Sequence, residues 1–192
     1  MMKHSFLFLF LFSLQSAWSQ STLPGYYIKQ NKDTVRAPFK LQKGLFGAIT
    51  NEFMSVAKFV DSADGTLKFR PEDIRGYGFE MNGAWVNLLS KPVSRSVSKF
   101  LEATVAGTNT SLYKYTVVTS GGAYPIARTT YTFERADGTF LFLKGVNSKK
   151  FAEQLKEFYK DYPEAVQLAD SKFKNWPDLE KDLIEILKVV NK

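Results

Sequence analysis

Short segments rich in aromatic and β-branched residues, separated by two-residue turn signals, run from about residue 25 to residue 144. The clearest signal is Asn82-Gly83, which stands between residues 76–81 and 84–89. Both central positions of a type I′ turn need positive φ, which Asn and Gly adopt at little cost. Asp64-Gly65 and Asp137-Gly138 have the same chemistry. Turn residues alone therefore predict three β-hairpins and an antiparallel fold.

Further strands are expected on either side of these hairpins. Residues 100–105 alternate apolar and polar side chains, as a strand buried on one face does, so a fourth hairpin is predicted around residues 107–109. A helix over residues 94–105 is the competing interpretation. Residues 26–28 and 34–41 are expected to form two more strands. The total of about eight to ten strands suits a sandwich, a roll or a barrel.

After Gly145 the spacing of apolar residues changes from every second to every third or fourth position. Asn147 or Ser148 is a suitable N-cap for a helix that ends before Pro163. A short helical stretch is expected around residues 164–172. The apolar stripe of the first helix is Phe151, Leu155, Phe158 and Tyr159.

A final helix is expected after Asn175, because Trp176-Pro177 precedes another apolar stripe. Both stripes need a surface to cover, and the β segments offer the nearest one. The predicted fold class is therefore α+β. An antiparallel sandwich, roll or barrel (residues 20–146) is followed by two or three helices (residues 147–192) packed on it, and the two parts are expected to form a single domain.

The first nineteen residues are predicted to be a signal peptide. Lys3 and His4 precede an apolar run of about nine residues, roughly half the length needed to span a membrane. Ala17 and Ser19 supply the small residues that signal peptidase reads, so cleavage is expected between Ser19 and Gln20. The chain has no cysteine for a lipid anchor. The expected product is an exported protein in the periplasm or outside the cell, with an association with the outer membrane as an option.

Loss of residues 1–19 would remove His4, the only histidine, from a chain without cysteine. Imidazole is the side chain used most often for proton transfer near neutral pH, imidazole and thiolate are the usual zinc ligands, and thiol nucleophiles need cysteine. No metal site and no cofactor are therefore expected. The chain carries a formal charge of +7, and its basic residues are scattered singly. We expect no nucleic-acid partner, and at most peripheral contact with an anionic membrane surface.

Carboxylates are the catalytic groups that such a chain retains, and glycosidases work with a pair of them. The candidates are Glu72, Asp73, Glu102 and Glu134. Each also has an ordinary structural interpretation. Glu72 and Asp73 follow Pro71 in a predicted turn, Glu102 lies on the polar side of a strand, and Glu134 ends a strand.

Aromatic residues on the predicted strands are candidates for ligand binding, because exposed rings on a β face can stack on sugars or peptides. Most strand aromatics instead belong to the core or to cross-strand pairs. The rings that we expect at a ligand site, if any are exposed, are Trp85, Tyr113 and Tyr115. Arg75 and Lys114 are their candidate polar partners.

Several short segments spread over most of the chain share a pattern with known proteins. They are residues 25–28, 31–35, 69–78, 100–102 and 111–115, together with the helical ending through residues 161–163. These segments resemble uncharacterised secreted proteins of Bacteroidota, a group with no established activity, cofactor or catalytic residue. The resemblance implies a destination in a Gram-negative envelope. Asp33-Thr-Val35 and Asp61-Ser-Ala63 also resemble that phylum's O-glycosylation signal, at Thr34 and Ser62, although a polar turn beside a strand is the preferred explanation of each.

Taken together, these features favour a non-enzymatic binding or accessory module of the bacterial envelope, with an envelope protein or glycan as its partner. The alternative is a carboxylate-dependent hydrolase that acts on envelope polysaccharide. Such a hydrolase needs two acids that face each other across a cleft, about 5 to 10 Å apart.

Overall fold

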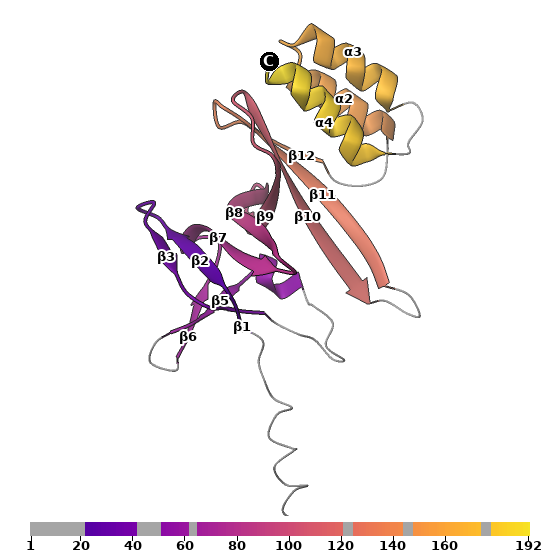
Figure 1. Ribbon diagram of the computed structural model, residues 1–192. Coiled ribbons are helices and arrows are strands. Elements are labelled where there is room, and N and C mark those ends of the chain that lie inside the picture. The colour runs from indigo at the N-terminus through magenta and orange to yellow at the C-terminus, as the bar shows by residue number, and fades with distance from the viewer. Residues whose placement is uncertain (1–21, 42–50, 62–64, 121–124, 144–147, 174–177) are drawn as a thin grey trace, which may run out of the picture.

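The computed structural model describes residues 22–41, 51–61, 65–120, 125–143, 148–173 and 178–192. These residues contain twelve strands in two antiparallel sheets, followed by three helices, which confirms the predicted α+β class (Figure 1). Both sheets are open within the described residues, so they form packed layers and not a closed barrel. The predicted signal peptide and its cleavage site at Ser19 and Gln20 lie outside the described residues.

The larger sheet has eight strands in the order β12-β11-β10-β9-β8-β7-β2-β3. Asn82 and Gly83 have φ values of 53° and 77°, as the predicted type I′ turn requires, whereas at Asp137-Gly138 only the glycine has positive φ, 83°. Asp64 of the third predicted turn lies outside the described residues. The helix considered for residues 94–105 is wrong, since that stretch lies mostly in a strand. The bounds are β2 (Gly25–Lys29), β3 (Thr34–Arg36), β7 (Ile74–Met81), β8 (Ala84–Ser94), β9 (Val97–Val105), β10 (Thr110–Ser120), β11 (Pro125–Arg135) and β12 (Phe140–Leu143).

The smaller sheet has the order β1-β4-β5-β6. The single strand predicted at residues 34–41 is divided between the two sheets. Its first part pairs with β2, and its second part pairs with β5. Pro38 lies at the division, where a residue without an N–H group does not interrupt a ladder. The bounds are β1 (Thr22–Leu23), β4 (Phe39–Lys40), β5 (Ala57–Val60) and β6 (Thr66–Phe69), with a 3-10 turn η3 at Asn51–Met54.

The two sheets enclose one hydrophobic core, which we call the sheet core. Phe39 of the smaller sheet stacks on Phe79 of the larger one, with ring centroids 4.4 Å apart and planes 7° from parallel. Tyr77 meets Phe100 edge-on at 4.8 Å. The buried members are Tyr27, Phe39, Ala57, Phe59, Ile74, Tyr77, Phe79, Leu88 and Phe100. Most of the strand aromatics are therefore structural.

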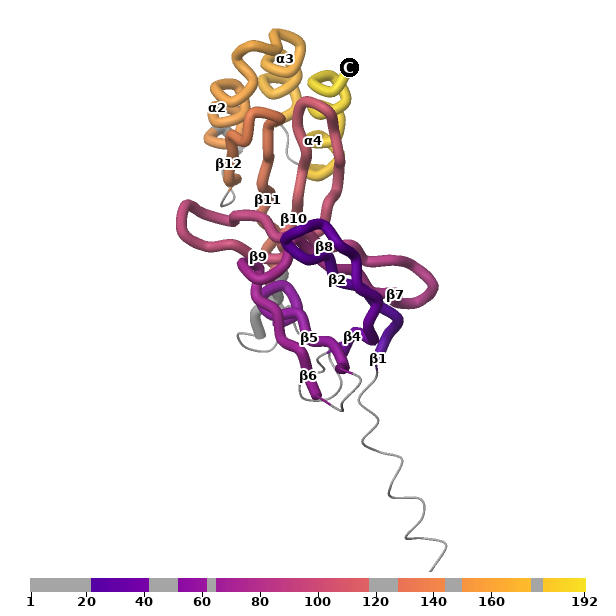
Figure 2. Tube along the Cα trace, turned by 90° about the vertical axis from the view of Figure 1, so that its left-hand side faces the viewer, coloured from indigo at the N-terminus to yellow at the C-terminus, as the bar shows by residue number. Residues whose placement is uncertain are grey.

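The three helices cover the other end of the larger sheet, beside β10, β11 and β12 (Figures 1 and 2). They are α2 (Ser148–Phe158), α3 (Pro163–Lys172) and α4 (Leu179–Val190), which confirms the three predicted helical segments. Of the first predicted stripe, Phe151, Leu155 and Tyr159 are buried against Leu112 and Phe133. The larger sheet thus contributes to two separate cores. Whether residues 20–192 fold as one domain stays a prediction.

Polar contacts fix α4 at both of its ends. At its first turn, Glu180 accepts hydrogen bonds from Lys114 at 3.4 Å and from the Tyr131 hydroxyl at 3.2 Å. Directly after its last residue, the side chain of Asn191 accepts from the backbone N–H groups of Asn109 and Thr110, both at 2.9 Å. It also donates to the Thr110 carbonyl at 2.9 Å, and the Asn109 side-chain amide donates to the Val190 carbonyl at 2.7 Å. The end of the final helix is therefore tied to the β9–β10 hairpin by two side-chain amides, and Asn191 makes three of the four hydrogen bonds.

Candidate functional site

An aromatic pair is exposed on the face of the larger sheet that points away from the sheet core. Trp85 at the start of β8 is 51% exposed, and Trp85 and Val97 are the exposed large apolar side chains of the described residues. Its ring lies 5.6 Å from the ring of Tyr26 on β2, tilted by 42°. Tyr27 and Leu88, their neighbours on the opposite face, are buried in the sheet core. The strand alternation therefore leaves this pair on the solvent side.

Gly78 on β7 lets the Tyr26 ring lie against the sheet. A Cβ atom at Gly78 would stand only 2.5 Å from Tyr26 Cε1, so any other residue there would displace the ring. The Tyr26 hydroxyl reaches across β7 and donates to Asn87 Oδ1 on β8 at 2.7 Å. The ring is thus fixed from below by a glycine and at its tip by an amide.

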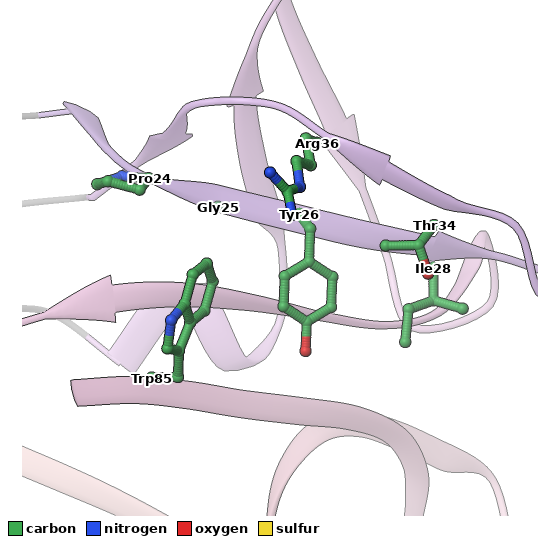
Figure 3. A pocket seen from close by; sticks show the side chains of 7 residues that line it. All are labelled: Pro24, Gly25, Tyr26, Ile28, Thr34, Arg36 and Trp85. Atoms are coloured by element: carbon green, nitrogen blue, oxygen red, sulfur yellow. The ribbon is translucent and has the colours of Figure 1, made fainter.

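A shallow groove of about 660 Å³ opens around the pair. Figure 3 shows the side chains that line it. The side chains of Arg36 and Thr34 on β3 stand on one side of it, and Trp85 stands on the other. Arg36 is exposed and forms no ion pair with the described residues. The full lining is Pro24, Gly25, Tyr26, Ile28, Thr34, Arg36 and Trp85. We call this site the Tyr26–Trp85 groove.

The chemistry of the groove suits binding. Burial raises the pKa of Tyr26, so its phenol stays protonated and donates to Asn87 at neutral pH. Arg36 contributes a guanidinium group with several N–H donors in one plane. The lining contains no carboxylate, thiol or imidazole. Two aromatic faces, one hydroxyl and one guanidinium can stack and donate hydrogen bonds, but they supply no acid–base pair.

The candidate carboxylates Glu72 and Asp73 lie in the turn between β6 and β7, outside the groove. Both are exposed. The carboxylate of Asp73 accepts from the backbone N–H of Arg70 at 2.7 Å, and Glu72 lies 4.0 Å from the Arg70 guanidinium. These contacts match the turn-capping role considered in the sequence. Arg75, proposed as a ligand partner, is exposed near the start of β7, whereas Trp85 pairs with Glu80 near the other end of that strand.

Glu134 and Tyr113 are brought together, within a half-buried ion pair. Lys91 Nζ lies 2.5 Å from Glu134 Oε2, and the Tyr113 hydroxyl donates to the same oxygen at 2.8 Å. The lysine also lies over the Tyr113 ring, 5.0 Å from its centroid. Tyr113 is 5% exposed, so it is not the exposed binding ring that the sequence suggested. Burial, followed by the hydrogen bond to Glu134, raises the Tyr113 pKa, which keeps the phenol a donor.

Glu102 and Lys114 form a second pair, on the face of the sheet that the helices cover. Lys114 Nζ lies 3.4 Å from both Glu102 Oε1 and Glu180 Oε1. The lysine thus neutralises two carboxylates and joins β9, β10 and α4. Tyr115 on β10 is half-buried and lies opposite Thr130. No two of the four candidate acids are brought face to face across the groove.

The groove therefore contains one residue predicted from the sequence, Trp85. The residues that sequence reasoning missed are Tyr26, Arg36 and Asn87, which lie on three different strands. Thr34 was named as a glycosylation site, and it lies exposed in the groove lining. Ser62 lies outside the described residues. Tyr26 had been noted only as part of a strand.

We expect the protein to lose stability in alkali because of Tyr131 on β11. Burial, then the nearby Glu180 carboxylate, raises the pKa of Tyr131 to about 12. Unfolded tyrosine ionises near pH 10. The neutral phenol is therefore favoured in the folded state, and its stabilising effect is complete below about pH 10 and is lost as the pH rises towards about 12. We expect the urea midpoint to fall over this window, together with the appearance of tyrosinate absorbance.

Lysines also titrate in that range, so the Tyr131→Phe variant serves as the control. Phenylalanine has no proton to lose, and the urea midpoint of this variant should depend less steeply on pH than that of the native chain. Equal slopes for the two proteins would contradict the assignment.

Comparison with known proteins gives no further guide to the function of this groove. No known protein-family model matches the chain, and no curated protein or solved structure is significantly similar to it. Among the described residues, no group of three or more His, Cys, Asp or Glu side chains is placed to hold a metal ion. None of the described helices is long and apolar enough to cross a membrane.

Proposed function

We propose that this chain is an exported, non-enzymatic binding module of the bacterial cell envelope, and that its Tyr26–Trp85 groove binds a saccharide. The half-exposed Trp85 ring beside Tyr26 is the observation that carries the proposal. A sugar ring has apolar C–H faces, which stack on aromatic rings, and hydroxyl groups at its edge. Thr34 and Arg36 stand where they can meet those groups.

The positive charge of Arg36 favours one class of saccharide. Arg36 is the charged residue of the groove lining, and guanidinium groups bind carboxylates and phosphates through paired hydrogen bonds. An acidic sugar, such as a uronic acid, therefore fits better than a neutral one. The proposed location is the periplasm or the cell exterior, where envelope glycans occur.

Titration with oligosaccharides tests this proposal. Neutral hexose oligomers and uronic-acid oligomers are added to the chain from Gln20 to Lys192, and binding is followed by the fluorescence of Trp85 in a Trp176→Phe background. We expect saturable binding with a preference for the acidic oligomers. Trp85→Ala, followed by calorimetry, should weaken binding by about 30-fold, because a buried tryptophan contact is worth about 2 kcal/mol at a binding site.

Two further variants separate binding from folding. Gly78→Ala does not touch the ligand, but it displaces Tyr26 and should weaken binding by about 10-fold. Val97→Ala removes the other exposed large apolar side chain, outside the groove, and should change nothing. The proposal fails if no oligosaccharide binds, or if Val97→Ala reduces binding as much as Trp85→Ala does.

A further inference from the structure

The outer face of the smaller sheet carries three lysines in one row across neighbouring strands. Lys58 on β5 lies directly opposite Lys68 on β6. On the other side of β5, Phe39 lies opposite Phe59, and the Val60 N–H donates to the Pro38 carbonyl at 2.9 Å. The same antiparallel register places Lys40 on β4 opposite Lys58. We call Lys40, Lys58 and Lys68 the lysine row.

The row faces away from the sheet core. Each lysine has a chain neighbour that packs in or against that core. These neighbours are Phe39 beside Lys40, Phe59 beside Lys58 and Leu67 beside Lys68. Because successive side chains of a strand point to opposite faces, the lysines point outward. Lys68 is exposed, and the other two are half-buried. Strands lie about 4.8 Å apart, so the row spans about 10 Å.

No acidic side chain compensates the row within the described residues. Like charges that lie directly opposite each other destabilise a pair of strands. None of the ion pairs among the described residues includes one of the three lysines. Among the described residues, nothing offsets their mutual repulsion, which a bound anion would relieve.

We propose that the lysine row binds the phosphate groups of an anionic lipid surface. The charges on one face of a sheet lie at a similar height, so all three lysines can contact a flat surface of headgroups together. Lysine offers a compact point charge that fits single phosphates. The other strand side chains on this face are Thr22, Val60 and Thr66, and none is aromatic. Single-stranded nucleic acid usually stacks its bases on aromatic rings, so the lipid surface is favoured over nucleic acid.

The row shares no residue with the Tyr26–Trp85 groove and lies on the opposite side of the two-sheet stack. The layers follow one another as groove, larger sheet, sheet core, smaller sheet and lysine row. A molecule bound to a membrane by the row would therefore hold its groove away from that membrane. This inference stands or fails independently of the saccharide proposal.

Vesicle binding of the chain from Gln20 to Lys192 tests the inference. The vesicles contain phosphatidylcholine with or without about 30% phosphatidylglycerol, and bound protein is measured by sedimentation. We expect binding only to the anionic vesicles, with a steep decrease as salt rises. The K40Q/K58Q/K68Q variant should bind about 100-fold more weakly, since each lysine near such a surface contributes about one factor of five.

The matched control is K29Q/K181Q/K188Q, which removes the same charge from exposed positions elsewhere. It should keep its binding within about three-fold. Equal losses in the two variants would show attraction by net charge alone and overturn the inference, as would no binding of the native chain. The row variant should also unfold at a urea concentration equal to or higher than that of the native chain, because removal of the three charges relieves their repulsion. If the row variant were less stable than the native chain, the claim that the three lysines repel one another without compensation would be wrong.

Two competitors identify the source of the phosphate. Inorganic phosphate at constant ionic strength should leave vesicle binding unchanged, whereas competition at low concentration would replace the surface with a discrete phosphate site. A single-stranded oligonucleotide should bind more weakly than the vesicles. Tighter, row-dependent binding of the oligonucleotide would overturn the lipid assignment in favour of nucleic acid.

Discussion

Replacing Phe39 by alanine should lower the free energy of unfolding by about 3–5 kcal/mol, measured by urea denaturation. Phe39 is fully buried between the two sheets. Its ring lies 4.4 Å from that of Phe79, 5.4 Å from Tyr77 and 5.5 Å from Phe59. The other rings are fixed on β7 and β5 of the two sheets, so they cannot close the cavity. Domains of this kind are stable by only about 5–15 kcal/mol, so about a fifth or more of the stability would be lost.

Trp85→Ala is the matched control for Phe39→Ala. It also removes a large aromatic side chain, but one that is half-exposed on the opposite face of the larger sheet. Its effect should stay within about 1 kcal/mol. If both substitutions changed the free energy of unfolding equally, Phe39 would not be a central residue of the sheet core.

Replacing Asn191 by alanine should lower the free energy of unfolding by about 3 kcal/mol, because partly buried backbone groups lose their partners. The amide holds two N–H groups and one carbonyl of the β9–β10 hairpin, and Thr110 among them is buried. Gly107 packs against the same amide, in a space that a Cβ atom would fill. Hydrogen exchange should accelerate throughout α4, since its C-terminal attachment is then reduced to the hydrogen bond from the Asn109 side chain to the Val190 carbonyl.

Two neighbouring changes show whether the amide itself is responsible. Asn191→Asp keeps the acceptor for the N–H groups of Asn109 and Thr110 but loses the donor to the Thr110 carbonyl, so its effect should be smaller. Lys192→Ala removes only an exposed ion pair with Glu164, at 3.6 Å, and should have almost no effect. A neutral Asn191→Ala would refute the anchoring role.

Much of the fold could be predicted because its signals are local. Positive φ at Asn82 and Gly83 depends on those two residues, and the change of period after Gly145 depends on side chains within a few turns. Both survive in the structure as a hairpin and as helices. The strand predicted at residues 34–41 failed for a non-local reason. Its two parts find different partners, β2 and β5, and no pattern within the segment reveals this.

The candidate site was less predictable, because exposure depends on what covers a residue. Tyr113 and Trp85 are both strand aromatics in the sequence. Glu134 binds the hydroxyl of the first and Lys91 lies over its ring, while the second is left half-exposed. Tyr26 joins Trp85 only because β2 pairs with β7 and β7 pairs with β8. The sequence predicted the type of side chain at the site, but it did not predict this group of strands.

By itself, the sequence determined where the chain turns, where its period changes from strand to helix, and which catalytic residue types it lacks. These are properties of single residues and of near neighbours. Only the tertiary structure decided that Gly78 lies beneath Tyr26, that Asn191 attaches α4, and that Lys40, Lys58 and Lys68 form one row. The physical reason is register. Strand pairing brings together residues tens of positions apart. Which strands pair depends on the total burial of both cores and not on any one segment.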